Sequence, residues 1–258
     1  MPSVRVGVQI KPQHATYAKM RDAWMRAEEM GTDTIYNWDH FYPLSGEPEG
    51  LHYECWTVLA AMAEATSRVK FGALVTCNSY RNPHLLADMA RTVDHISGGR
   101  VILGLGSGWC EKDYDEYGYP FKNAGQRLRD LDANMPLMIE RFKQLNPPPV
   151  QIPIPIMIGG TGEKVTLRIT AQYGHIWNGF GDPEEAGRLS RVLDQRCSEV
   201  GRDPSEIERS IMVNGGQLDV LDAYVNQGIT HLITGTEGPE YDLSGLEKLI
   251  KWRDSRVA

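Results

Sequence analysis

Hydrophobic side chains recur along the chain with two alternating periods. In residues 4–10 they occupy every second position, which predicts a strand. In residues 17–30 they recur three and four positions apart, which predicts an amphipathic helix, and Gly31 marks the end of that helix. The same order of strand and helix repeats along the rest of the chain, so the pattern predicts roughly eight strand–helix pairs.

The pattern assigns a range to each element. The predicted strands cover residues 4–10, 34–37, 70–76, 101–105, 156–158, 175–178, 210–213 and 231–234. The predicted helices cover residues 17–30, 53–65, 83–96, 128–142, 165–171, 189–200, 218–225 and 246–252. Pro136 lies inside the fourth of these helices, and a proline removes a helical hydrogen bond, so we expect a kink or a break there.

This alternation decides the expected fold. Strands that alternate with helices form a parallel sheet. Eight pairs in 258 residues favour a closed (β/α)8 TIM barrel, as one domain over residues 1–258, over an open doubly wound sheet. In either fold the ligand binds where the strands end and the following loops begin.

Composition narrows the partners and the compartment. The chain has 41% hydrophobic and 24% charged residues, which is ordinary for a globular protein, and no apolar run approaches the roughly 20 residues of a membrane helix. A net charge of -7 disfavours nucleic acid as a partner. The first residues lack a signal-peptide pattern, and the four cysteines show no CxxC spacing. We therefore expect a cytoplasmic protein with reduced thiols that binds neither nucleic acid nor a membrane. The net charge does not exclude an anionic small molecule as a ligand.

Two loops at predicted strand ends carry candidate chemistry. After the second strand, Asp39 and His40 form a carboxylate–imidazole pair suited to proton transfer, although a loop histidine can also simply hydrogen-bond its own segment. After the fourth strand, the glycines of GLGSGW, Gly106 among them, let a flat ring approach the backbone. In the same loop, Trp109 either walls a pocket or packs in the core.

The loop after the fifth strand has the composition of an anion site. Its glycines and lysine run into a predicted helix start, where backbone N–H groups and the helix dipole favour a phosphate. The residues concerned are Gly159, Gly160, Thr161, Gly162 and Lys164. The GxxxxGK[ST] phosphate motif is not matched, and the alternative is a tight turn with a solvated lysine.

Other sources of chemistry are poorly represented. The seven histidines show no ligand-like spacing, which argues against a metal site. No GxSxG motif occurs, and the cysteines have no base nearby in the sequence. A bound organic cofactor is therefore the expected source of the chemistry.

Five segments occur in a fixed order between residues 4 and 209: NWDHF, GALVTCNSYRNP, DHISGGRVILGLGSGW, IGGTGEK and GRDP. Together they resemble the luciferase-like monooxygenase superfamily, and most of all its branch of oxidoreductases that use the deazaflavin coenzyme F420. The resemblance implies a TIM barrel that binds a deazaflavin or flavin along its strand ends. It also implies hydride transfer between that cofactor and a small organic substrate.

The resemblance assigns roles to residues of this chain. The loop at residues 159–164 would hold the cofactor phosphate. Leu74, Val75 and Thr76 would lie behind the ring, and a non-prolyl cis peptide bond of the relatives maps to Leu74–Val75.

The resemblance also implies a proton-transfer group. That role would fall to His40, with Asp39, Glu111 or Tyr114 as alternates.

Several alternatives remain open. The chain could be a monooxygenase that uses flavin mononucleotide (FMN), a non-catalytic flavin- or deazaflavin-binding protein, or a metal-dependent barrel hydrolase. Many relatives carry a longer segment before the fifth strand, which helps to cover the site, where this chain has only residues 144–153. We therefore expect an open pocket, or one completed by a partner subunit in a homodimer.

Overall fold

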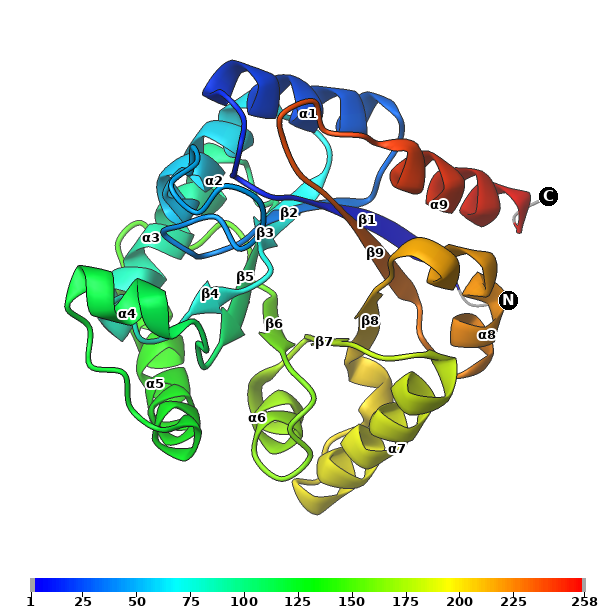
Figure 1. The fold of residues 1–258 in the computed structure, drawn as a ribbon. Helices are drawn as coiled ribbons and strands as arrows, with labels where there is room; N and C mark the ends of the chain where they lie inside the picture. Colours follow the sequence, from blue (N-terminus) through cyan, green and yellow to red (C-terminus); the bar gives the residue numbers. More distant parts are fainter. Residues whose placement is uncertain (1–2, 257–258) are drawn as a thin grey trace.

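A closed ring of parallel strands lies at the centre of the fold, and helices surround it (Figure 1). The computed structural model describes residues 3–256. The strands are β1 (Arg5–Ile10), β2 (Thr34–Asn37), β3 (Lys70–Ala73), β4 (Thr76–Cys77), β5 (Val101–Gly106), β6 (Ile156–Gly159), β7 (Ile176–Gly179), β8 (Glu208–Met212) and β9 (His231–Thr236). The strand β1 pairs with both β2 and β9, and β3 pairs with β5, so the ring closes.

The strands β3 and β4 share one position in the barrel. Both pair with β5, through Phe71 opposite Val101 and Thr76 opposite Leu105. The single strand predicted over residues 70–76 is therefore wrong in detail, because the chain leaves the ladder between these two pieces. It does so at the Leu74–Val75 peptide bond, which is cis as the resemblance implied. The ring has eight positions within residues 3–256, so the predicted (β/α)8 barrel is confirmed.

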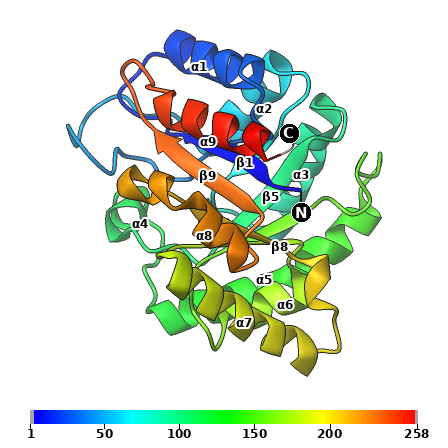
Figure 2. The same ribbon diagram turned by 90° about the vertical axis from the view of Figure 1, so that its right-hand side faces the viewer.

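Helices follow the strands around the outside of the ring (Figure 2). They are α1 (Tyr17–Glu29), α2 (Cys55–Ala65), α3 (Pro83–Ile96), α4 (Glu111–Tyr117), α5 (Ala124–Gln144), α6 (Thr166–Tyr173), α7 (Pro183–Glu199), α8 (Leu221–Asn226) and α9 (Ser244–Ser255), with short 3-10 turns at Pro204–Glu206 and Gly215–Asp219. None of these helices is long and apolar enough to cross a membrane.

Three helices differ most from the prediction, and one of them is α7, which begins at Pro183 and not at the predicted residue 189. The helix α4 was not predicted, because its seven residues carry no apolar stripe. The helix α5 begins earlier than predicted, at a capping box formed by Asn123 and Gln126, and runs through Pro136 without a break. Pro136 lies on the exposed side of α5, where water can bond the carbonyl group that the proline leaves unpaired.

Apolar side chains fill the interior of the strand ring and block its axis. They come from β2, β5, β6, β7 and β9 and from the chain between β3 and β4. This inner cluster consists of Tyr36, Leu74, Ile102, Met157, Ile176 and Ile233. Because it blocks the axis, the ring is a packed core, and a ligand can enter only beyond the carboxyl ends of the strands.

The short segment at residues 144–153 lies at the other end of the barrel. The backbone N–H of Gln151 donates to Asp94 at 2.9 Å, and its side chain donates to the carbonyl of Val101, the first residue of β5, also at 2.9 Å. The segment therefore does not cover the strand ends, because α5 carries the chain away from them before the segment begins.

Gly104 allows β5 to pack against the chain of β3. A Cβ atom at this position would lie 1.9 Å from the carbonyl oxygen of Ala73, which is rigid backbone. We predict that Gly104→Ala lowers the free energy of unfolding by about 2 kcal/mol or more, since overpacking at a fixed backbone forces the strands apart. Urea unfolding measures this loss. Gly216→Ala is the matched control, because a Cβ there meets open space, and equal midpoints for the two variants would contradict the prediction.

Candidate functional site

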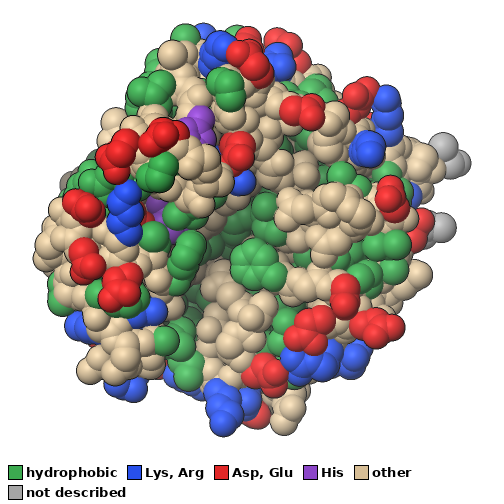
Figure 3. Space-filling model, in the orientation of Figure 1, with side chains coloured by type: hydrophobic (Ala, Val, Ile, Leu, Met, Phe, Trp, Pro, Cys, Tyr) green, Lys and Arg blue, Asp and Glu red, His purple; other side chains and the backbone are tan. Residues whose placement is uncertain are grey.

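A pocket of about 530 Å³ opens at the carboxyl ends of the strands. It appears as a hollow at the centre of the molecule, with hydrophobic side chains along its walls (Figure 3). Its volume lies in the range of small-molecule and cofactor sites. The side chains and backbone that line it come from Gln9, Lys11, Trp38, Asp39, His40, Leu44, Leu74, Val75, Cys77, Tyr80, Gly106, Ser107, Gly108, Trp109, Gly159, Gly160, Asn178, Phe180, Met212, Asn214 and Gly235.

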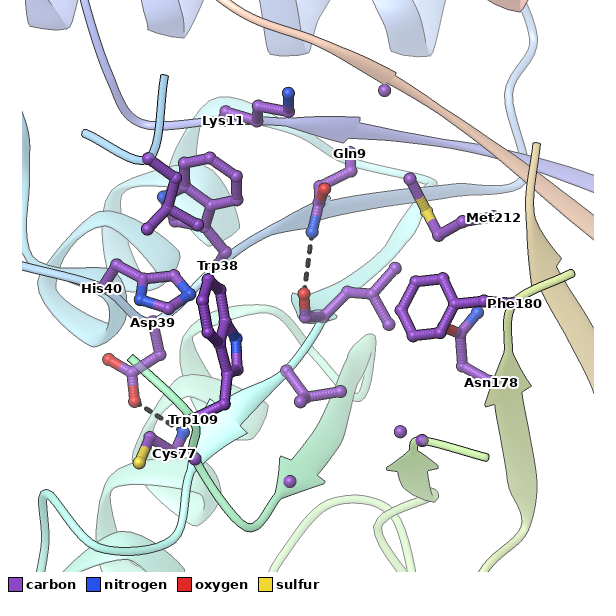
Figure 4. Close-up of a pocket in the computed structure, with 18 of the residues that line it drawn as sticks. Gln9, Lys11, Trp38, Asp39, His40, Cys77, Trp109, Asn178, Phe180 and Met212 are labelled. Carbon is purple, nitrogen blue, oxygen red and sulfur yellow. Dashed lines mark hydrogen bonds between the residues drawn. The ribbon is translucent and has the colours of Figure 1, made fainter. Parts of the chain in front are cut away.

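His40 lies between two indole rings on one wall of this pocket (Figure 4). Its ring centroid is 5.5 Å from that of Trp38 and 5.5 Å from that of Trp109, in edge-to-face contact with each. Trp109 is nonetheless 64% exposed, so it is a pocket wall and not part of the core. The imidazole therefore meets the cavity in apolar surroundings.

A buried carboxylate holds the imidazole in place. Nδ1 of His40 lies 2.6 Å from Oδ2 of Asp113, a residue of α4, and the other oxygen of Asp113 accepts the N–H of Phe41 at 3.0 Å. Burial of Asp113 favours its neutral form, but the hydrogen bonds from His40 and Phe41 outweigh burial and hold the pKa of Asp113 below its ordinary value. The ionised carboxylate keeps a proton on Nδ1 and leaves Nε2 for a ligand.

Asp39 has a different environment, although it is adjacent in sequence. It is 2% exposed and forms a two-pronged ion pair with Arg81, at 2.6 and 3.0 Å, while the N–H of Cys77 donates to it at 2.9 Å. Burial alone lowers the pKa of Arg81, but the carboxylates of Asp39 and Glu54 raise it above its ordinary value. With its oxygens engaged in this way, Asp39 anchors the loop and is less suited than His40 to proton transfer.

The cofactor residues predicted at the strand ends fall into two groups. Six of them line the pocket: Leu74, Val75, Gly106, Trp109, Gly159 and Gly160. Thr76 is fully buried in β4 and does not line it. Thr161, Gly162 and Lys164 are exposed and lie outside the lining. Lys164 precedes α6, which begins at Thr166, so it lies in the turn before the helix and not in the first helical turn.

The two alternate proton donors on α4 lie outside the lining. Glu111 is exposed at the start of the helix. Tyr114 is fully buried, and its hydroxyl group lies 3.3 Å from Sγ of Cys77. Burial raises the pKa of Tyr114 well above its ordinary value. Neither group reaches the cavity as His40 does.

Several residues in and around the pocket were not among those singled out in the sequence. Gln9, the residue before the last of β1, donates to the carbonyl of Leu74 at 2.7 Å, so it holds the chain between β3 and β4 in position. Asn178, near the end of β7, is 1% exposed, and its side-chain N–H donates to Ser210 at 3.0 Å while its oxygen is buried without a partner. Both residues were detectable by their place near strand ends, whereas nothing in the sequence connects Asp113 to His40.

Three side chains near His40 form the metal-compatible group found within residues 3–256. The ligand atoms of His40, Cys110 and Asp113 lie within 4.8 Å of one another. Sequence spacing does not show this group, because His40 lies in the loop after β2 while Cys110 and Asp113 lie at the start of α4, and these segments meet only in the fold. The direct hydrogen bond between His40 and Asp113 engages one ligand atom of each residue.

Most of the chain matches a known family. Residues 3–214 match the family model described as luciferase-like monooxygenase. The chain belongs to the luciferase-like monooxygenase family. The family resemblance of the five ordered segments is therefore confirmed.

Relatives by sequence and solved structures of similar fold bear different names. An uncharacterized protein of Mycobacterium tuberculosis is 29% identical over 200 residues, which cover 72% of this chain and 68% of its own. The F420-dependent glucose-6-phosphate dehydrogenase of Amycolatopsis mediterranei is 39% identical over 125 residues, 47% of this chain and 37% of its own. A structure of an F420-dependent secondary alcohol dehydrogenase has a TM-score of 0.84 at 16% identity, with 97% of this chain and 98% of that chain covered. At this identity the structural likeness establishes the fold.

A second histidine supports the pocket wall of this luciferase-like barrel. The indole N–H of Trp38 donates to Nε2 of His52 at 3.1 Å, so His52 must be neutral at that nitrogen. Burial, together with the nearby His40, lowers the pKa of His52 from 6.5 to about 4. Protonation of His52 would break the bond that positions Trp38.

The depressed pKa of His52 predicts a loss of stability in acid. Between pH 6.5 and about 4 the unfolded chain binds a proton that the folded chain does not, so stability falls as the pH falls through this window. We predict that His52→Gln, which keeps an acceptor for Trp38 but cannot titrate, removes on the order of 2 kcal/mol of this pH dependence. Urea unfolding at pH 7, 5.5 and 4.5 measures it. Identical pH slopes for the two proteins would contradict the assignment.

Proposed function

We propose that this protein is an F420-dependent oxidoreductase that transfers a hydride between the deazaflavin and a small organic substrate. The observation that carries the proposal is the imidazole of His40, held by the carboxylate of Asp113 at 2.6 Å and presented to a cavity at the strand ends. The name of the Amycolatopsis mediterranei relative supports the choice of cofactor.

The walls of the pocket fit a flat ring on one side. A Cβ atom at Gly106 would lie 2.6 Å from the side chain of Val75, and one at Gly159 would lie 2.9 Å from it. Glycine at both positions therefore leaves Val75 in place and keeps this side of the pocket smooth. The unpartnered oxygen of Asn178 is an acceptor suited to the N–H of a pyrimidinedione ring, which flavins and deazaflavins share.

The exposed loop that follows β6 fits the cofactor phosphate. Gly160 has a φ of 127°, a conformation that side chains rarely adopt, and it turns the chain out of the strand toward α6. Beyond it, Thr161, Gly162 and Lys164 are exposed. Backbone N–H groups and an ammonium group in such a loop favour an anion.

The chemistry divides between the cofactor and the chain. When bound, the deazaflavin accepts or donates a hydride, which is two electrons with one proton. Nε2 of His40 takes the proton from a substrate hydroxyl group in one direction and returns it in the other. Asp113 positions His40 and offsets the positive charge that develops on the imidazole. The rings of Trp38 and Trp109 give the imidazole apolar neighbours in edge-to-face contact.

Flavin mononucleotide is the second candidate cofactor. A solved type II Baeyer-Villiger monooxygenase in complex with FMN shares the fold with a TM-score of 0.65, over 82% of this chain and 67% of that chain. The features above would hold either ring, so the choice between the two cofactors depends on measured affinity.

Cofactor titration is the first test. We predict micromolar or tighter binding of F420, monitored by tryptophan quenching, with weaker binding of FMN.

Lys164→Ala should weaken F420 binding by about 1–2 kcal/mol and reduce its salt dependence, because one charge-assisted contact is lost. Gly160→Val should weaken binding further, since it blocks the backbone conformation. The control is Lys248→Ala on α9. Tighter binding of FMN would reverse the choice of cofactor, and normal binding by both loop variants would place the phosphate elsewhere.

Turnover tests the role of His40. We predict that His40→Ala and His40→Asn each lower kcat about 100- to 10,000-fold, as expected for loss of an acid–base group, while most F420 affinity remains. Asp113→Asn should lower kcat in the same direction and change the pH profile, because the imidazole loses the partner that fixes its proton. Asp115→Asn, an exposed residue of the same helix, is the control. Near-normal turnover of His40→Asn would show that His40 only orients the loop.

A further inference from the structure

Large apolar side chains surround the mouth of the pocket. Trp109 is 64% exposed, Phe180 is 55% exposed and Leu44 is 36% exposed. They come from three different loops, and Figure 4 shows the rings of Trp109 and Phe180 on opposite sides of the cavity. Large exposed apolar side chains that gather at one cavity are typical of a binding site for an apolar ligand.

One cation reaches the cavity, and it is already paired. Among the described residues that line the pocket, Lys11 is the only lysine or arginine. Its ammonium nitrogen lies 3.1 Å from Oε2 of Glu237 and 5.4 Å from the centre of the Trp38 ring. An anionic substrate would therefore meet a neutralised lysine at this end of the barrel.

The carboxylate of Glu237 is held in its charged form. The same oxygen that pairs with Lys11 accepts a hydrogen bond from Gln13 at 2.7 Å and one from Ser45 at 2.9 Å. Partial burial favours the neutral acid, but the donors Lys11, Ser45 and Gln13 outweigh it and lower the pKa of Glu237. Three donors also fix the side chain in place, so the charge that opposes an anion is fixed in position.

We propose that the substrate is an uncharged, mainly apolar alcohol or the carbonyl compound formed from it, and that Glu237 excludes anionic substrates by neutralising Lys11. This inference rests on the proposed function. In the oxidising direction the carbinol C–H bond breaks and its hydride goes to the deazaflavin. The O–H proton goes to Nε2 of His40, and the C=O double bond forms. The reverse direction consumes reduced deazaflavin and returns the proton to oxygen.

The proposal separates this chain from its named relative. Glucose 6-phosphate, which the name of the Amycolatopsis mediterranei relative specifies, carries a dianionic phosphate and several hydroxyl groups. The pocket described here offers such a molecule two exposed aromatic rings and a paired lysine. Desolvating a phosphate against these groups is unfavourable, so this sugar phosphate should bind poorly.

A homologous series of ligands tests the proposal. The methyl ketones from 2-butanone to 2-octanone are titrated into the F420-loaded protein and into the protein alone, with tryptophan fluorescence as the readout. We expect the dissociation constant to fall about three- to fourfold for each added methylene group, as for burial in an apolar site. The keto acid 7-oxooctanoate, which matches 2-octanone in length, should bind at least tenfold more weakly, and glucose 6-phosphate more weakly still.

Variants assign the selectivity to particular side chains. The wild-type protein should show a higher dissociation constant for 7-oxooctanoate than for 2-octanone. Glu237→Gln should reduce the ratio of these two dissociation constants at least fivefold, because Lys11 is then unpaired. Lys11→Met should increase the ratio. Glu240→Gln, which removes an exposed carboxylate that pairs with Lys19, is the matched control. Trp109→Leu and Phe180→Leu should weaken the dependence of the dissociation constant on the number of methylene groups in the ketone. Leu85→Ala, which changes an exposed leucine on α3, should leave this dependence unchanged. Circular dichroism checks that each variant is folded.

The outcomes distinguish this inference from the proposed function. A flat ketone series, or tighter binding of 7-oxooctanoate or glucose 6-phosphate than of 2-octanone, overturns the inference while F420 binding leaves the proposed function intact. Failure of F420 to bind overturns the proposed function itself. If the ratio of the dissociation constants of 7-oxooctanoate and 2-octanone is unchanged in both Glu237→Gln and Lys11→Met, Glu237 does not exclude anions.

Discussion

The hydrogen bond between His40 and Asp113 joins two segments that are 73 residues apart in the chain. It fixes the loop after β2 to α4, and the same carboxylate holds the N–H of Phe41 and, at 3.3 Å, the hydroxyl group of Tyr80. Around it, the ring of Phe41 stacks on Tyr117 with centroids 3.8 Å apart. One buried carboxylate thus orders the imidazole, the helix above it and the aromatic cluster that supports both.

The repeating architecture was predictable because it depends on periodicity. Alternating periods of two and about four identify strands and helices without any knowledge of contacts, and they gave the barrel and the strand ends as the place to search for a site. Asp39 and His40 followed from that rule. Both residues line the pocket, but the structure gives them different partners, because Asp39 pairs with Arg81 and His40 pairs with Asp113. Neighbours in sequence on an irregular loop need not share a direction, and no periodicity reveals this.

Features that depend on long-range contact were not predictable in this way. The helix α4 has no apolar stripe, since Asp113 and Tyr114 are its buried residues and one of them is charged. Its stability comes from partners in the loop after β2 and in β4, so a local pattern cannot detect it. The split between β3 and β4 is similar, because the carbonyl of Leu74 there accepts a hydrogen bond from Gln9 on β1, which lies beyond β2 in the ring. The cis bond there was expected only because of the family resemblance.

Polar groups in and around the pocket hold its walls in place. Trp38 is anchored by His52, Lys11 is paired with Glu237, and the chain at Leu74 is held by Gln9. In each case the buried or half-buried polar partner is satisfied before a ligand arrives, so binding has little reorganisation to drive. The exception is the oxygen of Asn178, which is buried without a partner. The site is therefore preorganised for a ligand that brings a hydrogen-bond donor to this oxygen. The pyrimidinedione N–H of the proposed cofactor would be such a donor.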